Sequence, residues 1–292
     1  MFAAISRYDA AAEAPAPLAL ERGDGAAEIA FARRGDGRTV LAHLYQRSPC
    51  RVLFPDPEPG DLPLAALLTT SGGLAGGDRL RLEVTAGAGA AALATTAAAE
   101  KVYGSADRDV AVAVSLTVEE RGWLEWLPQE TILFDGARFD RRVSVAVAGE
   151  ARFLGVEMLV FGRAARGERF AHGRLYESWR VRCGGRLAWA DALSLEDDVG
   201  RQLASPVGFA GAAALATAVF VGADAAAHLP LARALAEDGE CRGGATLLGS
   251  VLVARFLDAR AEIVRAALAA YVAGLRQGAA GLPAVLPRLW GT

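Results

Sequence analysis

Short runs of alternating apolar and polar residues recur along most of this chain. They cover residues 39–45, 80–84, 110–118, 123–127, 143–147, 176–182 and 187–195. Alternation with a period of two turns one set of side chains toward a core and the other toward solvent, as half-buried β-strands require. Turn signals separate the runs, and strands repeated at intervals of about a dozen residues favour stacked sheets over βαβ units. We therefore predict a mainly β, stacked-sheet architecture.

The last third of the chain has a helical pattern. Apolar residues from Val264 to Leu275 are spaced three or four positions apart, which is the spacing of an amphipathic helix. Asp258 is the expected N-cap of this helix, and Gly278 lies near its expected end.

A shorter helix is expected after Asp224, although Pro230 would limit or kink it. Helical elements are thus predicted around residues 224–277, and residues 282–292 are predicted to form an extended tail. Because no clean linker divides the chain, we predict a single domain over residues 28–292. Residues 1–27 are expected to be a loosely ordered leader without a secretory signal pattern.

Residues 202–223 carry no charge and approach the length of a membrane span. Glycines and Pro206 interrupt the stretch, and alanine, which dominates it, contributes little apolar area. A turn followed by a buried strand at residues 215–221 is therefore expected, and no membrane association is predicted.

The charges argue against nucleic acid as a partner. Lys and Arg total 31 against 34 Asp and Glu, for a formal net charge of −3, and no basic stripe of the kind that neutralises phosphates is evident. Cys50, Cys183 and Cys241 are too far apart for a zinc or redox motif. Three unpaired cysteines are compatible with a reducing cytosol, so a cytoplasmic location is expected.

The glycine cluster at residues 71–78 has the glycine spacing of a phosphate loop but lacks its chemistry. Asp78 and Arg79 stand where such a loop needs Lys and then Ser or Thr. We expect turns between strands here, with the Asp78 carboxylate accepting hydrogen bonds from local amides, while a functional role for Asp78 stays open.

No catalytic set is evident in the sequence. A serine elbow and a cysteine that a histidine could activate are both missing. His43, His172 and His228 have no ligand spacing, so no high-affinity metal site is predicted.

Carboxylates within or beside apolar strands are more informative, because a buried ionised group needs a partner. Arginines occur near them in the sequence, and two such acids converging in one cleft would suit a hydrolase. A non-catalytic β binding module is the other alternative. The acids are Glu125, Glu130, Asp135, Glu157, Glu168 and Asp191, and the nearby arginines are Arg138, Arg141, Arg142, Arg163, Arg166 and Arg180.

Two features of the sequence, its hydrophobic content and its single lysine, each have two possible explanations. Hydrophobic residues make up 53% of the chain, which fits either a surface that a partner covers or an excess of alanine from codon usage. Lys101 is the only lysine among the basic residues. Its retention fits either chance or a site that needs a compact ammonium group.

Three successive motifs, at residues 67–78, 93–103 and 125–136, resemble the signatures of the UreD family of urease accessory proteins. Residues 155–168, Asp191 and the ending at residues 287–290 continue the resemblance in order. The chain departs from the family pattern at Thr69, Ala97 and Gly104, which puts polar contacts made through those positions in doubt.

The resemblance implies a helical-sheet, β-helix-like fold and a non-enzymatic role in the insertion of nickel into urease. The implied partners are a UreF-like protein, a UreG-like GTPase, apo-urease and, indirectly, a UreE-like nickel carrier. No cofactor is expected to bind tightly, and nickel would be handled transiently through oxygen ligands that exchange quickly. Candidate conduit or partner-contact residues are Asp78, Lys101, Glu130, Asp135, Glu157, Arg163, Glu168 and Asp191, and the candidate partner tail includes Arg288 and Trp290.

Overall fold

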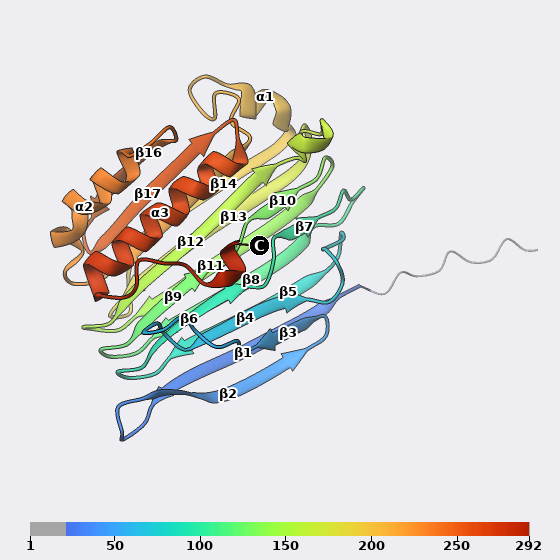
Figure 1. Ribbon diagram of the computed structural model, residues 1–292. Coiled ribbons are helices and arrows are strands. Elements are labelled where there is room, and N and C mark those ends of the chain that lie inside the picture. The colour runs from blue at the N-terminus through green and yellow to red at the C-terminus, as the bar shows by residue number, and fades with distance from the viewer. Residues whose placement is uncertain (1–21, 292) are drawn as a thin grey trace, which may run out of the picture.

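Two stacked β-sheets form the body of the protein, which is described here by a computed structural model over residues 22–291 (Figure 1). Sheet A has the spatial order β14-β13-β11-β8-β5-β1-β2. Its strands are β1 (Asp24–Arg33), β2 (Thr39–Arg47), β5 (Arg79–Ala86), β8 (Val110–Val118), β11 (Arg138–Val147), β13 (His172–Cys183) and β14 (Arg186–Asp198).

Sheet B has the order β16-β17-β15-β12-β9-β6-β4-β3, with β10 paired to both β12 and β7. Its strands are β3 (Cys50–Leu53), β4 (Leu64–Thr69), β6 (Ala91–Thr96), β7 (Glu100–Val102), β9 (Trp123–Leu127), β10 (Thr131–Leu133), β12 (Arg152–Phe161), β15 (Ala214–Val221), β16 (Arg242–Leu248) and β17 (Val251–Asp258).

The central strands coil as a β-solenoid. From β5 to β13 the chain passes repeatedly between the sheets. The long strands pair in parallel with the preceding long strand of their own sheet, while the short strands β7 and β10 pair with each other and β10 also pairs with β12. In sheet A, Leu80 pairs with Val112, Val112 with Arg141, and Arg141 with Glu177. The number of residues between one paired position and the next differs from turn to turn of the solenoid, which explains why the sequence shows no fixed-period repeat. The predicted stacked, β-helix-like fold is confirmed.

The alternating runs all lie in strands, and all but residues 123–127 lie in sheet A. This sheet packs one face on sheet B and exposes the other, so β8 and β11 alternate between buried and more exposed positions. The middle of sheet B is covered on both faces, and β12 and β15 are buried almost throughout. A strand that is buried on both faces lacks the alternating polar residues of a half-buried strand. Strand β9 is likewise buried at every position, including Glu125.

The described residues also include three α-helices, α1 (Val199–Ala204), α2 (Ala225–Glu237) and α3 (Ala261–Ala280), with short 3-10 helices η1 (Ala164–Arg166) and η2 (Arg288–Gly291). One hydrophobic core lies between the sheets, and a second lies between sheet B and α2, α3 and the C-terminal segment. Figure 1 shows α2 and α3 lying over this face of sheet B. None of the helices in residues 22–291 combines the length and apolar character needed to cross a membrane.

The helix boundaries differ slightly from expectation. Helix α3 is preceded by Arg260 rather than Asp258, whose carboxylate instead accepts the Arg260 backbone N–H at 2.9 Å. It continues past Gly278 and ends before Gly281, whose left-handed conformation stops it. Helix α2 follows Asp224 as expected and contains Pro230.

Both ends of the domain also differ from expectation. Strand β1 starts at Asp24, within the expected leader, because residues 24–27 pair with β5 despite their small side chains; residues 1–21 lie outside the described part. The C-terminal segment is not a free arm. It packs on sheet B and buries Trp290. A lone tryptophan near a terminus gives no sequence signal that distinguishes burial within the chain from burial against a partner.

Candidate functional site

The three sequence motifs meet at one edge of the solenoid. The loops after β4, β7, β10 and β12 emerge at the carboxyl ends of strands that run in the same direction. We call these loops, residues 70–78, 103–109, 134–137 and 162–171, the motif edge; it lies on the right in Figure 1, beyond β7 and β10.

A continuous row of contacts joins these loops. The Tyr103 hydroxyl donates to the Gly72 carbonyl at 3.0 Å, and the Tyr103 ring meets Phe134 edge-on with centroids 5.1 Å apart. The Arg163 guanidinium lies 4.1 Å from the Phe134 ring centroid and bonds to the Glu168 carboxylate. The contacts place residues far apart in the sequence on one surface.

Asp135 and Glu168 hold the loops of this edge together. Glu168 accepts the Asp135 backbone N–H at 3.0 Å, and its hydrogen bond with Arg163 lowers its pKa. Asp135 accepts the backbone N–H groups of Ala171 and His172 at 2.9 and 2.8 Å. Both acids, with Arg163, therefore contribute to the shape of the motif edge.

Asp78 fixes the glycine loop from inside. Its buried carboxylate accepts the backbone N–H groups of Gly23 and Ala75, each at 2.8 Å. Gly72 and Gly77 adopt positive φ, as the expected turns require. Lys101 lies beside this loop on β7 with its side chain exposed.

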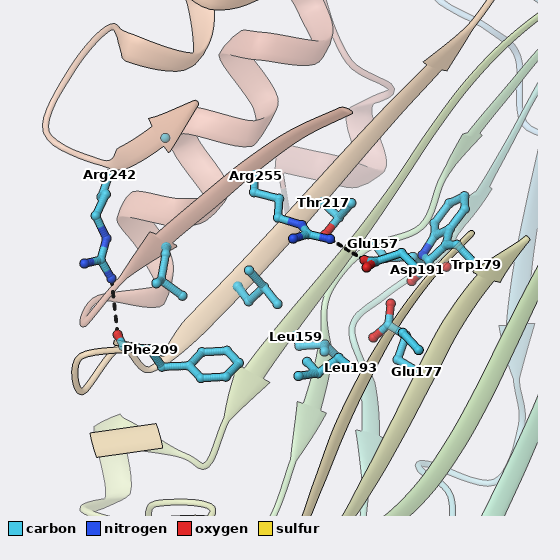
Figure 2. Close-up of a pocket in the computed structure, with 15 residues that line it drawn as sticks. Glu157, Leu159, Glu177, Trp179, Asp191, Leu193, Phe209, Thr217, Arg242 and Arg255 are labelled. Atoms are coloured by element: carbon cyan, nitrogen blue, oxygen red, sulfur yellow. Dashed lines mark hydrogen bonds and ion pairs between the residues drawn. The ribbon is translucent and has the colours of Figure 1, made fainter. Parts of the chain in front are cut away.

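A second group of charged residues lines a cavity of about 410 Å³ between the sheets (Figure 2). Glu157 on β12 and Glu177 on β13 approach from opposite sheets, and buried Arg141 on β11 bonds to both. The distances are 2.7 Å to Glu157 and 3.1 Å to Glu177. Trp126 Nε1 donates to Glu157 at 3.1 Å, and Arg141 also donates to the Thr131 hydroxyl.

One arginine faces two carboxylates here, so the group carries one excess negative charge when both acids are ionised. Burial, opposed by Arg141 and reinforced by Glu177, raises the pKa of Glu157 to about 7. The Glu157 side chain can therefore take up or release a proton near neutral pH.

The rim of the cavity carries an ion pair that bridges the sheets. Asp191 on β14 pairs with Arg255 on β17, as the dashed line in Figure 2 marks. Leu159, Leu193 and Phe209 form apolar walls near them. Of the eight candidate residues, Glu157 and Asp191 thus share the cavity.

Glu130 lies apart from both groups. Its carboxylate bonds to Arg265 on α3, on the face of sheet B away from the cavity. Arg265 also donates to the Trp290 carbonyl at 2.6 Å, and Gln129 donates to the Leu289 carbonyl at 2.9 Å. Glu130 therefore helps to hold the C-terminal segment against the fold. The Arg288 side chain of that segment is 87% exposed and pairs with Glu58 at the surface.

Glu177 was not among the site residues predicted from the sequence, and Arg141 was predicted only as an arginine near the acids. The sequence nevertheless contains a signal for both. Each is a charged residue at a position where the alternating strand turns its side chains toward the core. Arg141 lies between Phe139 and Val143 on that face of β11, and Glu177 lies between Leu175 and Trp179 on that face of β13. They are also direct partners in the β11–β13 register. Within residues 22–291, no cluster of three or more His, Cys, Asp or Glu side chains has the arrangement of a metal site.

Changing Glu157 to Gln is expected to alter how stability depends on pH. From pH 4.5 to about 7 the folded chain retains a Glu157 proton that the unfolded chain has released, so this residue makes stability fall as pH rises. Urea unfolding of wild type and Glu157→Gln across this range should show the wild-type free energy of unfolding declining relative to the variant. Parallel pH profiles would contradict the assignment.

Comparison with known proteins gives one consistent family. Residues 23–291 match the family model described as UreD urease accessory protein. A protein named urease accessory protein UreD from Magnetococcus marinus is 42% identical over 271 residues, covering 91% of this chain and 93% of the relative. One of the same name from Rhodopseudomonas palustris strain BisB5 is 38% identical over 288 residues, covering 98% of each.

Proposed function

This chain belongs to the UreD family of urease accessory proteins, and from that premise we propose that it is a non-catalytic maturation factor that assists insertion of nickel into urease. It acts in the cytoplasm, docks on apo-urease, and works with a UreF-like protein and a UreG-like GTPase. A UreE-like carrier delivers the nickel upstream. Nickel is cargo in this proposal, with no tightly held cofactor.

The observation that carries the proposal is that Glu157 and Glu177, which line the cavity between the sheets, share one buried counter-charge, Arg141. Two buried carboxylates with one counter-charge provide oxygen ligands and, when both are ionised, a local excess of negative charge. Oxygen ligands from Glu bind borderline divalent cations less persistently than a cage of Cys and His would. Such a group suits transit of an ion better than its storage.

The position of Arg141 also disfavours the hydrolase alternative. Glu157 and Glu177 do converge, but the guanidinium lies between them and occupies hydrogen-bonding positions that a water or a scissile bond would need. The relatives are named as accessory proteins, which favours the maturation role over a generic β binding module.

The test is to change Glu157 or Glu177 singly to Gln and to co-express each variant with the urease genes. Each variant keeps one carboxylate beside Arg141, so no buried charge is left uncompensated and the chain should fold. We expect the nickel content per urease active site to fall severalfold while the yield of accessory complex is unchanged.

Glu130→Gln is the matched control, because it makes the same chemical change outside the cavity. It should load nickel normally wherever the chain remains folded. Normal loading by both cavity variants would contradict the transit role of this group. A loss of complex yield in parallel with loading would instead make the two acids structural.

A further inference from the structure

The cavity between the sheets opens at one end of the stack. Strand β14 is the last strand of sheet A there, and β16 and β17 are the last two strands of sheet B. The lining residues Glu157, Glu177 and Trp179 are buried, whereas the side chains of Asp191 and Arg255 are 36% and 51% exposed. We call the part of the cavity rim formed by Asp191 and Arg255 the mouth.

In sheet B a row of three side chains leads from the buried acids to the mouth. Thr217 on β15 is the strand partner of Glu157 on β12 on one side and of Arg255 on β17 on the other. Directly paired residues turn their side chains to the same face of a sheet, and all three line the cavity. Arg255 is therefore the outermost member of a row that begins at Glu157.

In sheet A the carboxylate of the mouth lies close to the other buried acid. Asp191 on β14 is the strand partner of Trp179 on β13, two positions along β13 from Glu177. Asp191 and Glu177 are thus diagonal neighbours on the cavity face of sheet A (Figure 2). The buried indole N–H of Trp179 has no hydrogen-bond partner within residues 22–291, as expected beside a cavity that holds polar occupants.

An ion pair joins the two sheets at the mouth. Asp191 and Arg255 bond across the gap between β14 and β17, which belong to different sheets. Neither of them has a second ion-pair partner in the part of the chain that the structure describes. Arg242 on β16 also reaches across, but it donates to the Phe209 carbonyl at 3.2 Å rather than to a carboxylate, and Figure 2 marks both contacts. Arg255 is therefore the counter-charge that occupies Asp191.

The arginine at the mouth is easier to displace than the arginine inside. Arg141 is buried, so its removal would leave Glu157 and Glu177 without their shared counter-charge. Arg255 and Asp191 are both partly exposed, and ion pairs in contact with solvent contribute little to stability. A divalent cation carries twice the charge of a guanidinium and binds carboxylate oxygens directly. It can therefore take the place of Arg255 on Asp191 while Arg141 stays bound.

We propose that the Asp191–Arg255 ion pair controls the mouth and opens by cation exchange. A divalent cation replaces the Arg255 guanidinium on Asp191, which is then the outermost carboxylate of the cavity to bind the cation, with Glu157 and Glu177 further in. The inference deepens the proposed function and rests on it for the identity of the cation, nickel. Arg255 is a positioning residue, because it keeps Asp191 occupied when no cation is present.

The test is a cycle of variants compared by nickel affinity. Isothermal titration calorimetry with nickel chloride is carried out on the purified full-length chain at fixed ionic strength. Arg255→Gln frees Asp191 and should bind nickel about fivefold more tightly than wild type, the factor that corresponds to loss of one competing exposed ion pair. Arg255→Gln combined with Asp191→Asn should lose this gain. Arg255→Lys keeps a positive charge beside Asp191 and should bind nickel like wild type.

Arg242→Gln is the matched control, because it removes a positive charge from the same cavity without freeing a carboxylate. Its nickel affinity should stay close to that of wild type. Thermal melting should show all the variants folded, since the changed side chains are partly or largely exposed. The proposal is wrong if Arg255→Gln shows no gain in affinity, if the gain survives Asp191→Asn, or if Arg242→Gln gains as much.

The nickel content of co-expressed urease separates this inference from the proposed function. If the affinity cycle fails while Glu157→Gln still lowers the nickel content, cation exchange at the mouth is wrong and the transit role stands. If the affinity cycle succeeds while urease acquires its full nickel without this chain, the proposed function fails and cation exchange at Asp191 stands.

Discussion

Replacing Arg276 with Met is expected to destabilise the fold by about 3–5 kcal/mol, the usual cost of leaving buried charges uncompensated. Arg276 on α3 is completely buried. It bonds to both oxygens of Asp61 at 2.9 and 2.6 Å and to Glu125 at 3.1 Å. It also donates to the carbonyls of Pro283 and Val285. One side chain thus joins the helix, sheet B and the C-terminal segment.

Removal of this guanidinium leaves Asp61 and Glu125 without their main counter-charge. Burial already raises the pKa of Glu125, and Arg276 opposes that rise. Urea unfolding monitored by circular dichroism measures the loss, and Gln277→Met is the control, since it introduces the same side chain at the next, exposed position of the helix. If Arg276→Met loses no more free energy of unfolding than Gln277→Met, the ion pairs and hydrogen bonds of Arg276 contribute little to stability.

Trp290→Ala is expected to cost a similar amount, about 3–5 kcal/mol for loss of a large buried aromatic. The Trp290 side chain is only 8% exposed, and its Nε1 donates to the Leu127 carbonyl at 3.1 Å. Arg265 stacks near the same ring, with 5.1 Å to the centroid. The substitution opens a cavity under the end of the chain and leaves a buried carbonyl without this donor.

The free energy of unfolding of the isolated chain distinguishes this role from a partner contact. Arg288→Ala, two residues earlier, should have little effect because that side chain is mostly solvated. If Trp290→Ala leaves stability unchanged but abolishes co-purification with the UreF-like protein, the tryptophan acts on a partner after all.

The strands could be predicted from the sequence where one face of the strand is exposed to solvent. Strands β8 and β11 alternate in sequence because their outer side chains meet solvent. Strand β12 gives no such signal, since ten residues from Arg152 to Phe161 lie between sheet A and the helices and are nearly all apolar. Alternation therefore indicated only residues 123–127 of sheet B, and the strand at residues 215–221 was expected from its uncharged run after a turn.

The candidate site was predictable in part for a similar reason. The motifs identified Asp78, Asp135 and Glu168, but their neighbourhood arises from the parallel pairing of β7, β10 and β12, which local sequence does not encode. Glu130 and Glu157 looked alike as acids beside apolar strands. Only the tertiary fold separates Glu130, bonded to Arg265 outside, from Glu157, bonded to Arg141 inside.

The most direct test of the maturation role is the nickel content of urease produced with its full set of accessory genes, with and without this chain. Metal per active site is measured on purified urease, alongside urease activity. If the chain is a maturation factor, urease should be nickel-poor and largely inactive when the chain is omitted, and nickel should be restored when the wild-type chain is supplied in trans. Full nickel occupancy in its absence would contradict this role.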